Sequence, residues 1–96
     1  MTTWRQLRKE RLELPAARVG YERARRSFEI GARVRELRTA RGLTQAQLAA
    51  LVGTSQSALA RLEAGGVEPR ISTLEAIGDA LGVKLVVDLV ESGRAS

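Results

Sequence analysis

The sequence contains no cysteine and no histidine, and only three of its 96 residues are aromatic. Without cysteine the chain has no disulfides and no thiolate chemistry, and without histidine it lacks the commonest catalytic base and metal ligand. These absences argue against most hydrolytic and zinc-dependent reactions. We therefore expect a protein that is not an enzyme and that uses no catalytic residue, cofactor or metal.

Long apolar runs are also missing. No stretch approaches the roughly 18 apolar residues of a membrane span, and the arginine-rich start lacks the apolar stretch of a secretory signal. We therefore expect a cytoplasmic protein without a membrane partner. With so few aromatic residues the core must be aliphatic, and a chain of this length has room for one modest core. This composition favours packed helices.

Positive charge is concentrated in the first half of the chain. The net charge is +5 and the isoelectric point is near 11.0. Residues 1–41 hold 12 of the 16 basic and 5 of the 11 acidic residues, a net charge of +7, whereas residues 42–96 carry a net charge of −2. A basic protein of this kind suits a polyanionic partner.

The N-terminal third has helical signals. Thr3 and Gln6 form a possible capping box for a short helix through Leu12, and Pro15 suits the first position of a second helix. Two apolar stripes follow at helical spacing on different faces: Ala17, Tyr21, Ala24 and Phe28, then Ile30, Val34 and Leu37. Gly31 lies where the stripes change over, so the chain either breaks there or continues as one long helix.

Three further helices are predicted from caps and glycines. Gly42 ends the preceding helix, and a capping box of Thr44 and Gln47 opens a helix over residues 45–52. A turn at residues 53–55, with Ser55 as the predicted N-cap, leads to a helix that begins at Gln56 and stops at the glycine pair 65–66. A third capping box, Ser72 with Glu75, predicts a last helix that ends at residue 82.

Residues 83–90 change to a period of two, which predicts one β-strand with Val83, Leu85, Val87 and Leu89 on one face. The chain has no second convincing strand, so this strand should pair with its copy in a homodimer. The expected organisation is a helical extension (1–30), a helical domain (31–82), a dimerisation strand (83–90) and a tail (91–96).

The spacing of apolar residues in the two helices on either side of the turn at residues 53–55 predicts how these helices pack. The glycine of the turn lets the two helices cross closely and bury their apolar faces against each other. The outer face of the second helix is then free, and Gln56, Ser57 and Arg61 come together on it. Glutamine can bond bidentately to adenine and arginine to guanine, so these three residues are candidate base contacts. Candidate phosphate contacts lie at the start of the preceding helix and around the turns: Gln45, Thr44, Thr54 and Arg41.

These segments resemble the repressor/Cro (XRE) helix-turn-helix family. The resemblance rests on GLTQ at 42–45, LA at 48–49, glycine at 53, SQ at 55–56 and R-x-E-x-G at 61–65. It implies a mainly helical, lambda-repressor-like domain in which Gln45 contacts phosphate and residues 56, 57 and 61 face bases. It also implies a structural ion pair between Arg38 and Glu63.

The overall build also resembles HigA-type antitoxins, which have a helical extension, one such domain and a C-terminal strand. That resemblance implies an antitoxin and autorepressor that binds a palindromic operator in double-stranded DNA and neutralises a RelE/HigB-like ribonuclease toxin. The toxin would contact Trp4, Tyr21 and Phe28. The alternatives are a stand-alone regulator whose basic extension contacts flanking phosphates, and a protein adaptor that does not bind DNA.

Two groups of residues permit two interpretations each. The arginines at 33, 35, 38 and 41 form either an ion-paired or solvated helix face, or a phosphate-binding face. The stripe from Tyr21 to Phe28 packs either against the helical domain or a second copy, or serves as a docking face for another protein.

Overall fold

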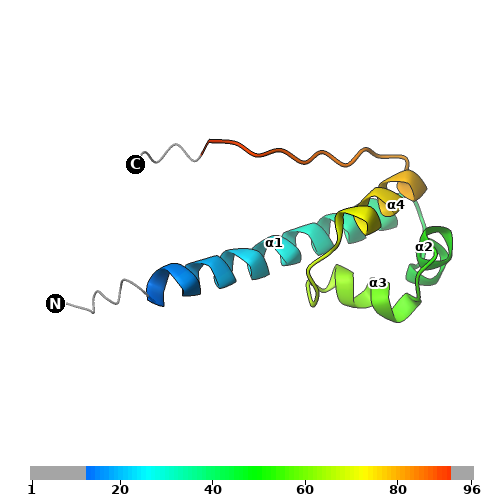
Figure 1. Cartoon of the computed structure of the whole chain (residues 1–96). Helices are drawn as coiled ribbons and strands as arrows, with labels where there is room; N and C mark the ends of the chain where they lie inside the picture. Colours follow the sequence, from blue (N-terminus) through cyan, green and yellow to red (C-terminus); the bar gives the residue numbers. More distant parts are fainter. Residues whose placement is uncertain (1–12, 92–96) are drawn as a thin grey trace.

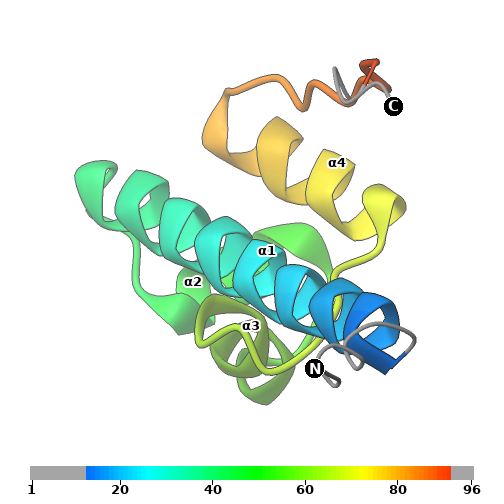
Figure 2. The same cartoon turned by 90° about the vertical axis from the view of Figure 1, so that its left-hand side faces the viewer.

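A computed structural model describes residues 13–91 as a bundle with one long helix and three short ones: α1 (Glu13–Ala40), α2 (Gln45–Val52), α3 (Gln56–Glu63) and α4 (Ile71–Leu81). The N-terminal half of α1 projects beyond the body that the other helices form around its C-terminal half (Figure 1). Figure 2 shows α3 and α4 on opposite sides of α1. The short helix predicted through Leu12, which includes Trp4, lies outside the described residues, as do the tail residues 92–96.

Helix α1 is continuous through Gly31, so the chain does not break where the two apolar stripes change over. Gly31 is buried, and a Cβ atom there would overlap the carbonyl oxygen of Leu62 and lie 2.7 Å from that of Glu63. The glycine therefore allows α1 to approach the end of α3 closely. The boundary expected between residues 30 and 31 falls inside this helix.

The ends of α2 and α3 confirm two of the predicted caps. The Thr44 hydroxyl accepts a hydrogen bond from the Gln47 amide, and the Gln47 side chain accepts one from the Thr44 amide, which makes the capping box complete. Ser55 caps α3 by accepting a hydrogen bond from the amide of Ala58. Both helices therefore begin where the sequence predicts.

The starts of α1 and α4 differ from expectation. Pro15 is the third residue of α1 rather than the first. The capping box of Ser72 and Glu75 was a wrong prediction, because α4 begins at Ile71 with Arg70 as its N-cap and has no side-chain cap. Its first helical hydrogen bond runs from the Leu74 amide to the Arg70 carbonyl at 3.0 Å, so Ser72 is already inside the helix.

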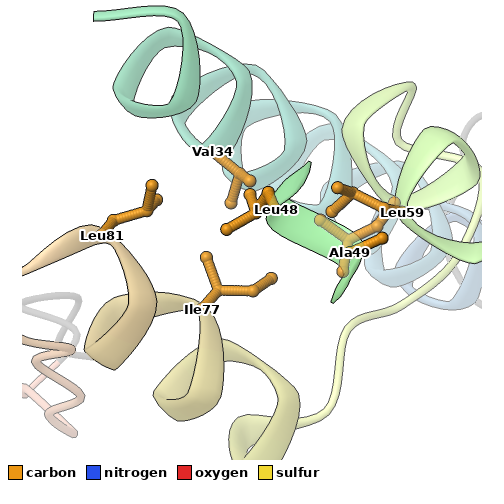
Figure 3. Packing of buried hydrophobic residues seen from close by; sticks show 7 residues of the cluster. Val34, Leu48, Ala49, Leu59, Ile77 and Leu81 are labelled. Carbon is orange, nitrogen blue, oxygen red and sulfur yellow. The ribbon is translucent and has the colours of Figure 1, made fainter. Parts of the chain in front are cut away.

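The core is aliphatic, as the composition predicts. Side chains from all four helices meet in it, and Leu48 and Leu59 are the largest that are fully enclosed (Figure 3). Its buried members are Val34, Leu48, Ala49, Leu59, Leu62, Ile77 and Leu81. The aromatic rings in the described range take no part in this core, because Tyr21 is 68% and Phe28 59% exposed.

The segment after α4, residues 83–91, runs back alongside α1 at a distance from it (Figure 1). It forms no β-strand within the described single chain. Leu85 is half-buried, whereas Val87 and Leu89 are exposed. The strand that pairs with its copy therefore stays a prediction. Among residues 13–91 there is no helix with the length and apolar character that crossing a bilayer requires.

Candidate nucleic-acid interface

The connection between α2 and α3 is a tight three-residue turn. Gly53 adopts a left-handed conformation with φ of 87°, which glycine tolerates without steric cost. The amides of Gly53 and Thr54 both donate to the Ala49 carbonyl at 2.9 Å, and Ser55 then caps α3. The turn thereby fixes the direction in which α3 leaves α2.

Helix α3 has one buried and one exposed face. Leu59, Leu62 and Glu63 are buried against the body. On the opposite face the structure places Gln56, Ser57 and Arg61, all exposed, with Ala60 half-buried between them. The three residues predicted to contact bases are thus brought together on the free face of one helix, two of them in its first turn.

A buried carboxylate holds the end of α3 to two other helices. Glu63 accepts hydrogen bonds from Arg38 Nε at 2.7 Å and Arg38 Nη2 at 3.0 Å, and from Gln45 Nε2 at 3.0 Å. Arg38 Nη1 donates in addition to the Leu43 carbonyl at 2.8 Å. The network joins α1, the start of α2 and the end of α3, so it fixes the orientation in which α3 presents its exposed face.

The ion pair between Arg38 and Glu63 is almost removed from solvent, with side chains 11% and 2% exposed. Burial acts to raise the pKa of Glu63, but hydrogen bonds from Arg38 and Gln45, together with the nearby charges of Arg38 and Arg35, outweigh it. The pKa of Glu63 is therefore below its ordinary value. The hydrogen bond with Glu63 in turn raises the pKa of Arg38. Both groups are charged at neutral pH.

The predicted phosphate contacts occupy different surroundings. Gln45 is half-buried and its side-chain amide is engaged with Glu63, which sequence reasoning missed. Thr44 is exposed, although its hydroxyl already accepts a hydrogen bond as the cap of α2. Thr54 is half-buried in the turn before α3. Of these residues, Thr44 and Thr54 flank α2, Thr44 as its N-cap and Thr54 in the turn that follows it.

Arg41 has a structural environment that the sequence did not suggest. Its Nε donates to the Leu81 carbonyl at the end of α4, and its Nη1 donates to the Leu37 carbonyl of α1 at 3.2 Å. A cation at two helix C-termini satisfies their free carbonyl groups and suits the negative end of the helix dipole. Leu81 is 40 residues away in sequence, so no local pattern could reveal this contact.

Two further arginines of α1 are paired within the helix. Arg33 Nη1 lies 2.8 Å from Glu36 Oε1, and Arg25 Nη1 lies 3.0 Å from Glu29 Oε2, with all four side chains more than half exposed. Such exposed pairs are weak, contributing up to about 1 kcal/mol. Arg33 and Arg38 thus have carboxylate partners, which favours the ion-paired interpretation at these two positions, whereas Arg41 bonds to backbone carbonyl groups.

A shallow groove of about 480 Å³ runs along α3 and adds residues that the sequence did not single out. Arg61 and Thr54 line it together with Arg70 and Thr73 from the start of α4. Arg70 was missed because it lies in a connection without helical periodicity.

Comparisons with known proteins agree with this geometry. Residues 34–87 match the sequence profile of the helix-turn-helix family (HTH_3). The chain is similar to an immunity repressor protein of Bacillus phage phi105, with 43% identity over 56 residues that cover 58% of this chain and 39% of the repressor. The chain therefore spans about two fifths of the length of this curated relative.

Two solved structures have the same fold over 60% of this chain. The restriction-modification controller protein C.AhdI from Aeromonas hydrophila has a TM-score of 0.59 and 34% identity, with 88% of its chain covered. An HTH_3 family transcriptional regulator from Vibrio cholerae has a TM-score of 0.58 and 33% identity, with 33% of its chain covered. The resemblance to HigA-type antitoxins is not supported by these relatives. The family profile covers more than half of the chain, which therefore belongs to the helix-turn-helix family.

Proposed function

We propose that this protein is a DNA-binding transcriptional regulator of the repressor type, which inserts the N-terminal part of α3 into the major groove. The observation that carries the proposal is the exposed face of α3, where Gln56, Ser57 and Arg61 lie together, whereas the opposite face is buried. Their side chains supply the amide, hydroxyl and guanidinium groups that read base edges.

The structure around α3 suits this role because recognition needs a helix held in one orientation. The turn at Gly53 fixes the start of α3, and the Glu63 network fixes its end. Half or more of the hydrogen bonds in such complexes go to the DNA backbone. We assign that part to Thr44, Gln45 and Thr54, with Arg61 serving bases.

The relatives point the same way, since they are named as an immunity repressor, a restriction-modification controller and a transcriptional regulator. By analogy we propose that this chain binds a palindromic operator as a homodimer, with the two α3 helices about one helical turn, or roughly 34 Å, apart. The base sequence of the operator then has two-fold symmetry.

Selection from a random duplex library tests the proposal. The wild-type chain should enrich one two-fold sequence, and Ser57→Ala should relax the preference at one position in each half-site. Ser72→Ala, the same change at an exposed position on α4, is the matched control and should leave the selected sequence unchanged. Failure of the wild-type chain to enrich any sequence would favour the adaptor interpretation.

A second candidate function is that of an antitoxin whose partner docks on the projecting part of α1. One observation favours it: Tyr21 and Phe28 lie seven residues apart on one helix face, and both are mainly exposed. Exposed aromatic side chains of this kind are enriched at protein interfaces. The partner proposed from the sequence is a RelE/HigB-like ribonuclease toxin.

Co-expression with the neighbouring open reading frame separates the two functions. Co-purification of a small protein, with rescue of growth from its toxicity, would establish an antitoxin. Tyr21→Ala with Phe28→Ala should then abolish rescue, whereas Leu51→Ala, an exposed apolar residue on α2, should not. If no partner co-purifies and no growth defect is rescued, the regulator without a toxin remains.

A further inference from the structure

An apolar groove of about 610 Å³ lies on the side of α1 opposite α3 (Figure 2). Helix α1 forms one wall with Ile30 and Val34, α4 forms the floor with Leu74 and Ile77, and the segment of residues 83–88 forms the other wall. Binding sites for small molecules have volumes of about 300 to 1,000 Å³ and are lined mainly by apolar side chains, with a few polar groups that orient the ligand. The groove therefore has the size and the lining of such a site.

One end of the groove holds a buried hydroxyl group without a partner. Ser27 lines the groove three residues before Ile30 and is 7% exposed. Its hydroxyl makes no hydrogen bond within the described part of the chain, whereas the hydroxyl of Thr39 on the same helix donates to the carbonyl groups of Arg35 and Glu36 at 3.0 and 3.1 Å. Buried polar groups in folded proteins nearly all have a hydrogen-bond partner. The isolated hydroxyl therefore indicates a polar ligand atom at this end.

Two arginines lie beside this hydroxyl and carry free positive charge. Arg23 and Arg26 line the groove, four residues and one residue before Ser27 on the same helix. Neither forms an ion pair with a described carboxylate, whereas Arg25, which is not among the residues of the groove, lies 3.0 Å from Glu29. Guanidinium groups match carboxylate and phosphate groups in charge and in geometry. The polar ligand atom at this end therefore belongs to an anion.

The remaining charged residues leave the groove net positive, with four cations and two carboxylates in its lining. Arg33 is paired with Glu36, and Lys84 follows the end of α4. Asp88 already accepts a hydrogen bond from the next amide in the chain at 2.8 Å, and Glu68 is exposed. The charge of the lining therefore favours an anionic ligand over a neutral or cationic one.

The apolar part of the groove has the length of one acyl chain. Leu37, the last residue of α1 in the lining, lies ten residues after Ser27, which corresponds to about 15 Å along the helix. The hydrogen bond from Arg41 to the Leu81 carbonyl holds the end of α4 beside the end of α1, so the floor extends equally far. One leaflet of the hydrocarbon core of a bilayer, which acyl chains fill, is also about 15 Å thick. An unbranched acyl chain therefore fits lengthwise, with its charged head at Ser27.

We propose that the groove binds the anion of a free long-chain fatty acid such as myristate. The Ser27 hydroxyl and the Arg26 guanidinium donate hydrogen bonds to the carboxylate, Arg23 adds positive charge, and the acyl chain lies between α1 and α4. The ligand thereby supplies the partner that the hydroxyl lacks and covers the apolar lining. The site goes beyond the proposed function, because it lies on the side of α1 opposite α3 and its occupancy is measurable without DNA.

Isothermal titration of the full chain with sodium myristate, below the concentration at which it forms micelles, tests the site. The wild-type chain should bind one myristate per chain with a saturating curve. Decanoate should bind more weakly, because each buried methylene group strengthens binding by up to about fourfold. Binding of either acid without saturation would overturn the proposal, as would the absence of binding.

Ser27→Ala separates a ligand contact from a structural role. The variant should raise the dissociation constant for myristate about tenfold, because a hydrogen bond to a charged group is lost. Without ligand it should melt at a higher temperature than the wild type, because an unpaired buried hydroxyl is removed and alanine has the higher helix propensity. A lower melting temperature of the free variant would mean that the hydroxyl already has a partner in the protein, and would overturn the assignment.

Arg26→Gln and Arg25→Gln form a matched pair at neighbouring exposed positions of α1. The first should raise the dissociation constant for myristate about tenfold, because Arg26 lines the groove, whereas the second should bind like the wild type. Equal constants for the two variants would overturn the proposal. Binding of the wild-type chain to phosphatidylglycerol vesicles without binding of free myristate would overturn it in favour of a lipid surface. A dimer in sedimentation that excludes myristate would overturn it in favour of a second copy of the chain.

Discussion

Arg38 of α1 and Glu63 of α3 form a bidentate, nearly buried ion pair, with Nε–Oε2 and Nη2–Oε1 distances of 2.7 and 3.0 Å. A third donor, Gln45 Nε2, completes the surroundings of the carboxylate. Because the two residues are 25 positions apart, the pair ties the last turn of α1 to the helix that carries the candidate base contacts. Orientation of that helix therefore depends on one carboxylate.

Replacing Glu63 with glutamine should lower the free energy of unfolding by about 3 kcal/mol or more, because Arg38 then remains buried without its counter-charge. Glu36→Gln is the matched control, since it removes the exposed partner of Arg33 and should change stability by no more than about 0.5 kcal/mol. Urea denaturation measures both. Similar small losses in the two variants would mean that the buried pair contributes little.

The lowered pKa of Glu63 predicts a loss of stability in acid. A carboxylate with a folded-state pKa below its unfolded value, about 4.3, stabilises the fold above that value and loses the contribution as the pH falls through the folded pKa. The free energy of unfolding should therefore fall as the pH drops below about 4. Glu63→Gln should show a shallower fall over the same window, and an unchanged slope would exclude Glu63 as a source of acid sensitivity.

Gln56 and Gln45 should differ in what they contribute to DNA binding. Gln56→Ala should cost about 1 to 3 kcal/mol of discrimination at particular base pairs, whereas Gln45→Ala should weaken all sequences alike. The structure adds that Gln45→Ala also removes a donor to Glu63, so it should lower stability by about 1 kcal/mol. Binding titrations on matched and mismatched duplexes, with thermal melting, measure both effects; equal losses of discrimination would contradict the assignment.

The projecting part of α1 gives a prediction about salt dependence. If Arg18 and Arg25 contact flanking phosphates, changing both to glutamine should reduce the slope of log affinity against log salt by about 1.8, since each phosphate contact contributes about 0.9. Lys84→Gln removes a positive charge from the segment on the other side of α1 from α3 and should leave the slope unchanged (Figure 1). Deletion of residues 1–30 would be a poorer test, because it would cut α1 in two.

The parts of this structure that could be predicted from the sequence are those with local signals. The cap at Thr44, the glycine turn and the cap at Ser55 each depend on residues within four positions, so the bounds of α2 and the start of α3 follow from the sequence. The exposed face of α3 follows in turn from helical periodicity. The ion pair of Arg38 with Glu63 needed the family resemblance as well.

What could not be predicted depends on contacts between distant segments. The hydrogen bonds of Arg41 to the Leu81 carbonyl and of Gln45 to Glu63 require the packing of whole helices. Ser72 and Glu75 have the right residue types and spacing for a capping box, yet the helix starts before them. The sequence could not decide between a break and a continuous helix at Gly31, because the close contact of this glycine with α3 is invisible in a one-dimensional pattern.

Two glycines of α1 allow that contact to be tested within a single helix. Gly20 is exposed and an added Cβ would meet nothing within 4 Å, so Gly20→Ala should stabilise the protein by up to about 1 kcal/mol through helix propensity. Gly31→Ala gains the same propensity but forces a methyl group against the carbonyl groups of Leu62 and Glu63, and we expect a net loss of about 1 to 3 kcal/mol. The melting temperatures of the two variants should therefore shift in opposite directions from that of the wild type. If both variants melted above the wild type, α1 and α3 could not lie as close as the structure shows. The end of α3 would then be held to the other helices only by the hydrogen bonds of Glu63 with Arg38 and Gln45.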